Sequence, residues 1–184
     1  MPHQQQSSGR RTSGEVAPDF EAECWDGSRV KLADADGRRT WLAFFRYASC
    51  PLCNLRVHQM ITRHEDYEAA GLRVLAVFQS APASISQYVG KQAPPFPLLC
   101  DPEEKLYALY GLTHSKLGLL HPANAVGLAQ AATKGFLPGK QDGTVDRLPA
   151  DFLLGPELRI EDAYYAKRIG EHIPFERVDA FLES

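Results

Sequence analysis

Two cysteines three positions apart carry the clearest chemical signal in this sequence. Cys50 and Cys53 enclose Pro51 and Leu52, and the four residues follow an apolar run at 41–45. Pro51 suits the first position of a helix, where the N–H that proline lacks would be unpaired in any residue. Side chains three apart on a helix are neighbours, so modest adjustment brings the two sulfurs within disulfide reach. The spacing therefore predicts a dithiol that cycles with its disulfide.

The predicted position of the pair, at the start of a helix, also explains why one sulfur would be reactive. A helix N-terminus has unpaired N–H groups and about half a positive charge, and both stabilise a thiolate. They can lower the pKa of a thiol from about 8.5 into the range of about 3.5–7.5. A thiolate attacks a disulfide or a peroxide, and a neighbouring thiol can then close an internal disulfide that protects the first sulfur from further oxidation.

A metal site and inert packing are the alternatives to redox chemistry. A closed zinc site needs a second pair of ligands, but Cys24 and Cys100 are isolated from each other and from the pair in sequence. His58 and His64 follow the pair at a spacing that matches no zinc finger. The sequence favours a redox dithiol that uses neither a metal nor an organic cofactor.

The composition is that of an ordinary soluble domain. The chain has 184 residues, of which 44% are hydrophobic and 23% charged, and its net charge is -3. Such a chain offers no basic field for nucleic acid, and no apolar run approaches the roughly 18 residues of a membrane span. Residues 1–14 lack the apolar centre of a secretory signal, so we expect a cytoplasmic protein with reduced thiols.

Alternating apolar runs and helical patterns predict one α/β domain over residues 15–184, after a disordered tail at 1–14. Strands are expected at 20–23, 29–32, 39–46, 72–78, 96–100, 151–154 and 159–166. Helices are expected from Pro51 to Gly71 and at 84–90, 103–110 and 174–182. This order implies a mixed sheet with helices on both faces.

Residues 112–143 interrupt that alternation. They are rich in Ala, Gly, Leu and Lys, and we expect a mostly helical insertion that breaks near Pro122. Its apolar residues could pack on the core, cover the cysteine pair as a lid, or contact a second copy of the chain in a homodimer.

Four segments resemble one known family. They are Ala17-Pro18-Asp19-Phe20 before the Asp26-Gly27 turn, Leu42 to Arg46 before the cysteine pair, Phe96 to Pro102 before Tyr110-Gly111, and Leu148 to Leu154. Over about residues 16–184 the chain resembles the peroxiredoxins of the AhpC/TSA family. The resemblance implies a thioredoxin-like, peroxiredoxin-type fold with a mixed central sheet and an N-terminal hairpin. It also implies a thiol-dependent oxidoreductase that reduces peroxides with electrons from an external thiol of the thioredoxin or glutathione type.

The sequence departs from the family's PxxxTxxC motif. In an ungapped alignment, Cys53 takes the position of the attacking cysteine, Cys50 replaces the threonine and Arg46 replaces the proline. In the thioredoxin register Cys50 attacks and Cys53 resolves. The second cysteine of such a motif lies inside the first helical turn, so we expect Cys50 to be the more exposed and to be the attacker. Without the threonine, protein disulfide exchange and non-catalytic redox sensing remain alternatives to peroxide reduction.

The resemblance implies an arginine beside the thiolate, where it stabilises negative charge. Arg46, Arg147 and Arg168 are the candidates, and Arg46 is nearest to the pair in sequence. Tyr47 and Ser49 are expected to line the site because they are adjacent to it.

Pro149 occupies the place of the superfamily's cis-proline. The resemblance implies a cis bond beside the cysteine pair, which would expose backbone to a substrate disulfide. The alternative is an ordinary trans proline that begins a strand.

Overall fold

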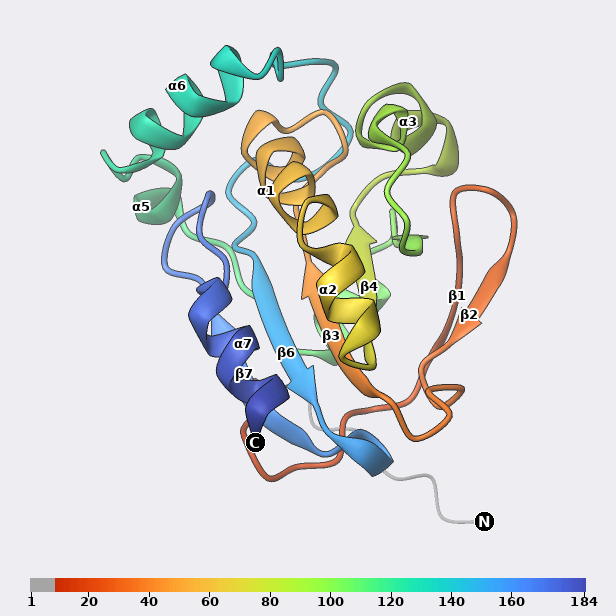
Figure 1. Ribbon diagram of the computed structural model, residues 1–184. Coiled ribbons are helices and arrows are strands. Elements are labelled where there is room, and N and C mark those ends of the chain that lie inside the picture. Colours follow the sequence, from red (N-terminus) through yellow and green to blue (C-terminus); the bar gives the residue numbers. More distant parts are fainter. Residues whose placement is uncertain (1–8) are drawn as a thin grey trace.

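A five-stranded mixed sheet forms the centre of the computed structural model, which describes residues 9–184 (Figure 1). Its strand order is β5-β4-β3-β6-β7, and the strands are β3 (Arg39–Phe44), β4 (Leu72–Phe78), β5 (Leu98–Cys100), β6 (Ala150–Leu154) and β7 (Ile160–Tyr165). β3, β4 and β5 are parallel, whereas β6 is antiparallel to both β3 and β7. A separate hairpin, β1 (Glu21–Glu23) and β2 (Arg29–Lys31), turns at Gly27, whose φ of +83° is accessible to glycine.

Helices cover both faces of this sheet, as the pattern predicted. α1 (Pro51–Ile61), α2 (His64–Ala69) and α7 (Phe175–Glu183) pack on one face, against a core that includes Trp41 and Phe78. α4 (Lys105–Leu109) packs on the other face, against Phe44 and Phe152. β3 and β4 are therefore buried on both sides, which explains why they read as continuous apolar runs. The predicted fold class is confirmed, and β4 has the predicted bounds.

Two predicted helices differ from the observed elements. The helix after the cysteine pair ends at Ile61 and resumes as α2, because the Thr62 hydroxyl donates to the Gln59 carbonyl and competes with the helical backbone. The helix expected at 84–90 is α3 (Pro82–Gln87) followed by a 3-10 turn at Val89–Gln92. No helix among residues 9–184 is long and apolar enough to cross a membrane.

The insertion is helical only in its first part. α5 (Lys116–Leu119) and α6 (Asn124–Thr133) are separated around Pro122, as predicted, and α6 packs beside α1 (Figure 1). Residues 134–147 form no helix, since Gly135, Pro138 and Gly139 interrupt them. We call residues 140–147 the strap, and this segment runs back across the end of β3 into β6.

The predicted disordered tail lies partly outside the described residues, which begin at residue 9. Residues 9–14 are instead attached to the domain. The backbone N–H of Arg11 donates to the Tyr165 hydroxyl at 2.6 Å, and its guanidinium donates to the Leu109 carbonyl at 2.8 Å. Gly14 donates its N–H to the Ile160 carbonyl at 2.7 Å, so the edge of β7 orders this segment.

The expectation of a cis bond at Pro149 is wrong, because no peptide bond in the described part of the chain is cis. Pro149 directly precedes β6, and its carbonyl accepts a hydrogen bond from Ala166 at 3.0 Å. The missing N–H of a proline costs no ladder bond at the start of a strand.

A buried carboxylate connects β6 to the segment before α7. Asp151 is fully buried and accepts hydrogen bonds from Trp41 Nε1 at 2.9 Å, from the Ile173 N–H at 2.9 Å and from His172 Nδ1 at 3.0 Å. Burial by itself would raise the pKa of Asp151, but His172, Arg56 and the Ile173 N–H together lower it.

We predict that Asp151→Asn lowers the free energy of unfolding by about 3 kcal/mol, because the amide leaves buried donors unpaired. Urea denaturation at pH 7 measures this. The folded pKa is lowered, so the stabilisation is complete above the ordinary value of 3.8 and is lost as the pH falls through the folded pKa. Asp162→Asn is the control, since the Asp162–Arg177 pair is partly exposed and should contribute less than about 1 kcal/mol. Equal losses in the two variants would contradict the prediction.

Candidate active site

The cysteine pair lies where β3 leaves the sheet and α1 begins. Cys50 is the N-cap residue of α1, with extended backbone (φ -68°, ψ 121°), and Pro51 begins the helix as predicted. Cys53 lies in the first turn. The side-chain amide of Asn54 donates to the carbonyls of Ala48 at 2.7 Å and Cys50 at 2.9 Å, so it fixes the turn that carries the first cysteine.

Both sulfurs are buried, and Cys50 and Cys53 each have 1% of their surface exposed. The expectation that Cys50 would be the more exposed is therefore wrong. The strap covers the loop before α1, because the Ser49 hydroxyl donates to the Lys140 carbonyl at 2.7 Å and Gly143 packs against the side chain of Tyr47. The two cysteines are present as free thiols.

Arg46 is the arginine that contacts the pair. Its Nη1 donates to the Cys50 Sγ at 3.2 Å, and its Nη2 donates to the Val145 carbonyl in the strap. The guanidinium also lies over the ring of Tyr47, with its carbon 4.9 Å from the ring centroid. Only 3% of Arg46 is exposed, so its charge acts on the sulfur with little screening by water.

The electrostatic environment separates the two thiols. Burial opposes ionisation of Cys50, but the Cys53 thiol, the Arg46 guanidinium and the N–H groups of Leu52 and Cys53 favour the thiolate and lower its pKa to about 6. Burial and the hydrogen bond to Cys50 raise the pKa of Cys53 well above its ordinary value. The environment therefore favours a thiolate at Cys50 and a thiol at Cys53.

The other predicted residues lie at different distances from this centre. Tyr47 and Ser49 adjoin it through the contacts above. Arg168 instead lines a pocket of about 350 Å³ together with Leu52 and His172, and neither cysteine lines that pocket. Arg147 lies at the end of the strap and forms an ion pair with Glu104, not with a cysteine.

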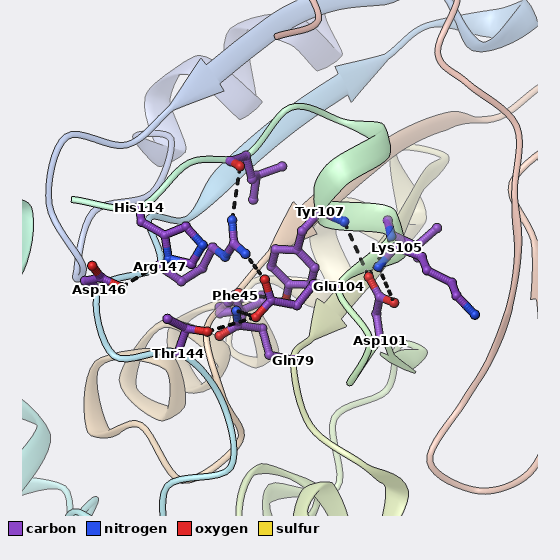
Figure 2. A network of polar contacts seen from close by, with 12 residues as sticks. Phe45, Gln79, Asp101, Glu104, Lys105, Tyr107, His114, Thr144, Asp146 and Arg147 are labelled. Carbon is purple, nitrogen blue, oxygen red and sulfur yellow. Dashed lines mark hydrogen bonds and ion pairs between the residues drawn. The ribbon is translucent and has the colours of Figure 1, made fainter. Parts of the chain in front are cut away.

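The polar network behind the strap contains residues that the sequence analysis missed (Figure 2). Glu104 Oε1 accepts hydrogen bonds from Gln79 Nε2 at 2.7 Å and from Thr144 Oγ1 at 2.9 Å, and its other oxygen pairs with Arg147. No local pattern signals this cluster, because its members come from three separate segments. Glu104 also has a φ of +56°, and nothing in the sequence predicts a left-handed backbone conformation at a glutamate.

The remaining two cysteines are of a different kind. Cys24 is buried and Cys100 half-buried. Burial raises the pKa of both thiols, that of Cys100 to about 12, which opposes a thiolate at either position. Across residues 9–184 the structure contains no group of three or more His, Cys, Asp or Glu side chains that could hold a metal ion.

Comparison with known proteins matches the sequence to one family. A sequence profile described as the AhpC/TSA family matches residues 13–162. The chain belongs to the AhpC/TSA family. Peroxiredoxin Bcp of Escherichia coli strain K12 is 27% identical over 104 residues, which are 56% of this chain and 67% of that protein. A Mycobacterium tuberculosis protein assigned to the peroxiredoxins is 33% identical over 102 residues, 55% of this chain, and the match spans 65% of that relative's length.

A solved structure supports the same assignment at the level of the fold. Peroxiredoxin 6 of Arenicola marina has a TM-score of 0.71 to this AhpC/TSA member and is 17% identical to it. The match covers 95% of this chain and 73% of that one. The sequence profile confirms the family resemblance inferred from the sequence, and the solved structure agrees with it in fold.

We predict that Arg46→Met raises the pKa of Cys50 by about one unit or more, because the thiolate loses a charged hydrogen-bond donor. Titration of the thiolate absorbance near 240 nm measures the pKa, with Cys50→Ser identifying the signal. Arg168→Met is the matched control, since Arg168 lines a pocket that neither cysteine lines. A pKa that stays constant in Arg46→Met, or moves equally in both variants, would show that Arg46 is not the stabilising charge.

Proposed function

We propose that this chain is a dithiol peroxidase in which Cys50 attacks the peroxide and Cys53 resolves the product. The observation that carries the proposal is the contact between Arg46 and Cys50, at 3.2 Å in a buried site. It supports the thioredoxin register of the motif, because the guanidinium lies on the first sulfur. Membership of the AhpC/TSA family supports peroxide as the oxidant.

The proposed cycle uses residues that are already in place. The Cys50 thiolate attacks one peroxide oxygen, the O–O bond breaks, and the other oxygen leaves as water or an alcohol after it takes up a proton. The sulfur is thereby oxidised to a sulfenic acid. Cys53, one helical turn away, attacks that sulfur, and the hydroxyl leaves as water with the Cys53 proton. The product is an intramolecular disulfide between Cys50 and Cys53.

The Arg46 guanidinium has two roles in this scheme. It stabilises the attacking thiolate, and it lies close enough to the sulfur to stabilise the charge that develops on the leaving oxygen. Because the site excludes water, both interactions are stronger than they would be on the surface.

Burial favours a small oxidant over a protein disulfide. With 1% of Cys50 exposed, a mixed disulfide with another protein requires the strap to move, whereas a hydroperoxide presents only two oxygens to the sulfur. Exchange with a protein disulfide, or redox sensing without turnover, is the second candidate and uses the same pair.

The oxidised pair must be reduced from outside, because the cycle consumes two electrons per peroxide. We propose an external thiol of the thioredoxin or glutathione type, which places the cycle in a compartment rich in reduced thiols, such as the cytoplasm. A protein thiol of the thioredoxin type would reach the disulfide only in an oxidised protein whose strap has moved, because the strap covers the site in the reduced form. A homodimer through the insertion remains a prediction.

We predict that wild type reduces hydrogen peroxide with a dithiol reductant and that Cys50→Ser abolishes this turnover, because no attacking sulfur remains. Cys53→Ser should consume one equivalent of peroxide in the absence of reductant and accumulate a sulfenic acid that dimedone traps. Peroxide consumption and mass spectrometry measure these outcomes. Loss of the first equivalent in Cys53→Ser, with retention in Cys50→Ser, would reverse the assigned roles.

We also predict that the wild type does not accelerate reduction of the insulin disulfides by a dithiol, since the buried sulfur is closed to a protein substrate. Thioredoxin assayed in parallel is the positive control. Turnover of insulin together with inactivity toward hydrogen peroxide would support disulfide exchange in place of peroxide reduction.

A further inference from the structure

The position of Arg46 depends on a segment far away in sequence. Its guanidinium forks between the Cys50 sulfur and the carbonyl of Val145. If that carbonyl moved, the guanidinium would lose one of its two hydrogen-bond acceptors and with it a contact that points Nη1 at the sulfur. Contacts that hold Val145 in place therefore also hold the Arg46 guanidinium beside the Cys50 sulfur.

One carboxylate holds the strap on both sides of Val145. Glu104 accepts the hydroxyl of Thr144, the residue before Val145, at 2.9 Å. It also forms an ion pair with Arg147, which is two residues after Val145 (Figure 2). The side chain of Arg147 is only 5% exposed. Arg147 is fixed further by its own bond from Nη1 to the Leu112 carbonyl at 3.0 Å and by the ring of Tyr107 beneath its guanidinium.

The same carboxylate reaches Arg46 by a second route. Gln79 donates its side-chain amide to Glu104 at 2.7 Å and its backbone N–H to the carbonyl of Arg46 at 3.1 Å. Glu104 thus contacts Gln79, which holds the backbone of Arg46, and the residues on either side of Val145, which holds its guanidinium.

Glu104 occupies a backbone position that does not favour a glutamate. Its φ of +56° and ψ of +27° lie in the left-handed region, where glycine or asparagine costs less. Its side chain does not cap α4 either, because Asp101 accepts the N–H groups of Lys105 at 3.0 Å and Leu106 at 2.7 Å. The contacts of Glu104 lie with the strap and with Gln79.

We propose that Glu104 is a positioning residue for the reaction: through Thr144, Arg147 and Gln79 it holds the strap so that Val145 keeps Arg46 on the Cys50 sulfur. The role of Cys50 as the attacker comes from the proposed function, on which this inference rests.

The direction in which the pKa of Cys50 shifts when Glu104 is removed distinguishes a positioning role from a direct electrostatic effect of the Glu104 charge. The titratable and charged groups that face Cys50 are Arg46, Tyr47 and Cys53. Glu104 is a negative charge further away, so by Coulomb's law alone its removal would lower the pKa of Cys50. If Glu104 acts by holding Arg46 in place, its removal instead raises that pKa.

The experiment titrates the Cys50 thiolate, by absorbance near 240 nm in reduced full-length protein without peroxide, in wild type, Glu104→Gln and Thr144→Val. We expect Glu104→Gln to raise the pKa by about one unit and Thr144→Val by about half as much. Thr144→Val alters no charge and little volume, so a rise there comes from geometry. Asp146→Asn is the matched control: it removes a carboxylate from the same strap, but one that pairs with the partly exposed His114, and it should not raise the pKa.

Near-ultraviolet circular dichroism establishes that each variant is folded, and Thr144→Val decides the matter if Glu104→Gln does not fold. A constant or lowered pKa in the folded variants overturns the positioning role. That result would not affect the peroxidase proposal, because the titration requires no turnover. If the wild type failed to reduce peroxide but the variants showed the predicted rises in pKa, the peroxidase proposal would be wrong and the positioning of Arg46 by Glu104 would still be supported.

Discussion

A thiolate in a buried site requires a positive group fixed against it, and this constraint organises the end of the domain that holds the cysteine pair. Desolvation disfavours the charged sulfur. Arg46 lies at 3.2 Å from that sulfur and outweighs the cost together with the helix N–H groups and the Cys53 thiol. Arg46 and Cys50 follow β3 four residues apart, between the end of that strand and the start of α1, so both lie at the same end of the sheet. The strap contacts Arg46 and the adjoining residues Tyr47 and Ser49. The Cys50 thiolate, the Arg46 guanidinium and the strap therefore depend on one another.

The proposed division of roles between the two cysteines rests on this environment. One helical turn separates them in the chain, yet the guanidinium lies on Cys50, and the hydrogen bond between the sulfurs raises the pKa of Cys53 while it lowers that of Cys50. A thiolate and a thiol in contact suit a cycle in which one sulfur is oxidised and the other closes the disulfide without a large movement of the chain. The AhpC/TSA assignment agrees with that chemistry.

Local patterns in the sequence were sufficient for the elements that present the site. The apolar run of β4, the Asp-Gly hairpin and the start of α1 at Pro51 depend on neighbours in the chain, and all three were predicted. The burial of Cys50 was not, because it depends on the strap, which arrives from about 90 residues later. Glu104 and its contacts were missed because its partners are also distant in sequence. In addition, no pattern in composition or periodicity predicts a left-handed backbone at a glutamate. The expected cis bond at Pro149 came from the family resemblance, and the local chemistry of a strand start proved the better guide.

In the proposed mechanism, a Cys50 thiolate stabilised by Arg46 attacks the peroxide. The most direct test is the pH dependence of the second-order rate constant for reduced Cys53→Ser with hydrogen peroxide, followed by stopped flow, beside the same protein carrying Arg46→Met. Cys53→Ser isolates the first step, and its serine hydroxyl still offers the Cys50 sulfur a hydrogen bond. We expect a rate that rises through a pKa well below that of an ordinary thiol and reaches a plateau, with the rise displaced to higher pH by Arg46→Met. A rate that rises only near pH 9, or one that Arg46→Met leaves unchanged, would contradict it.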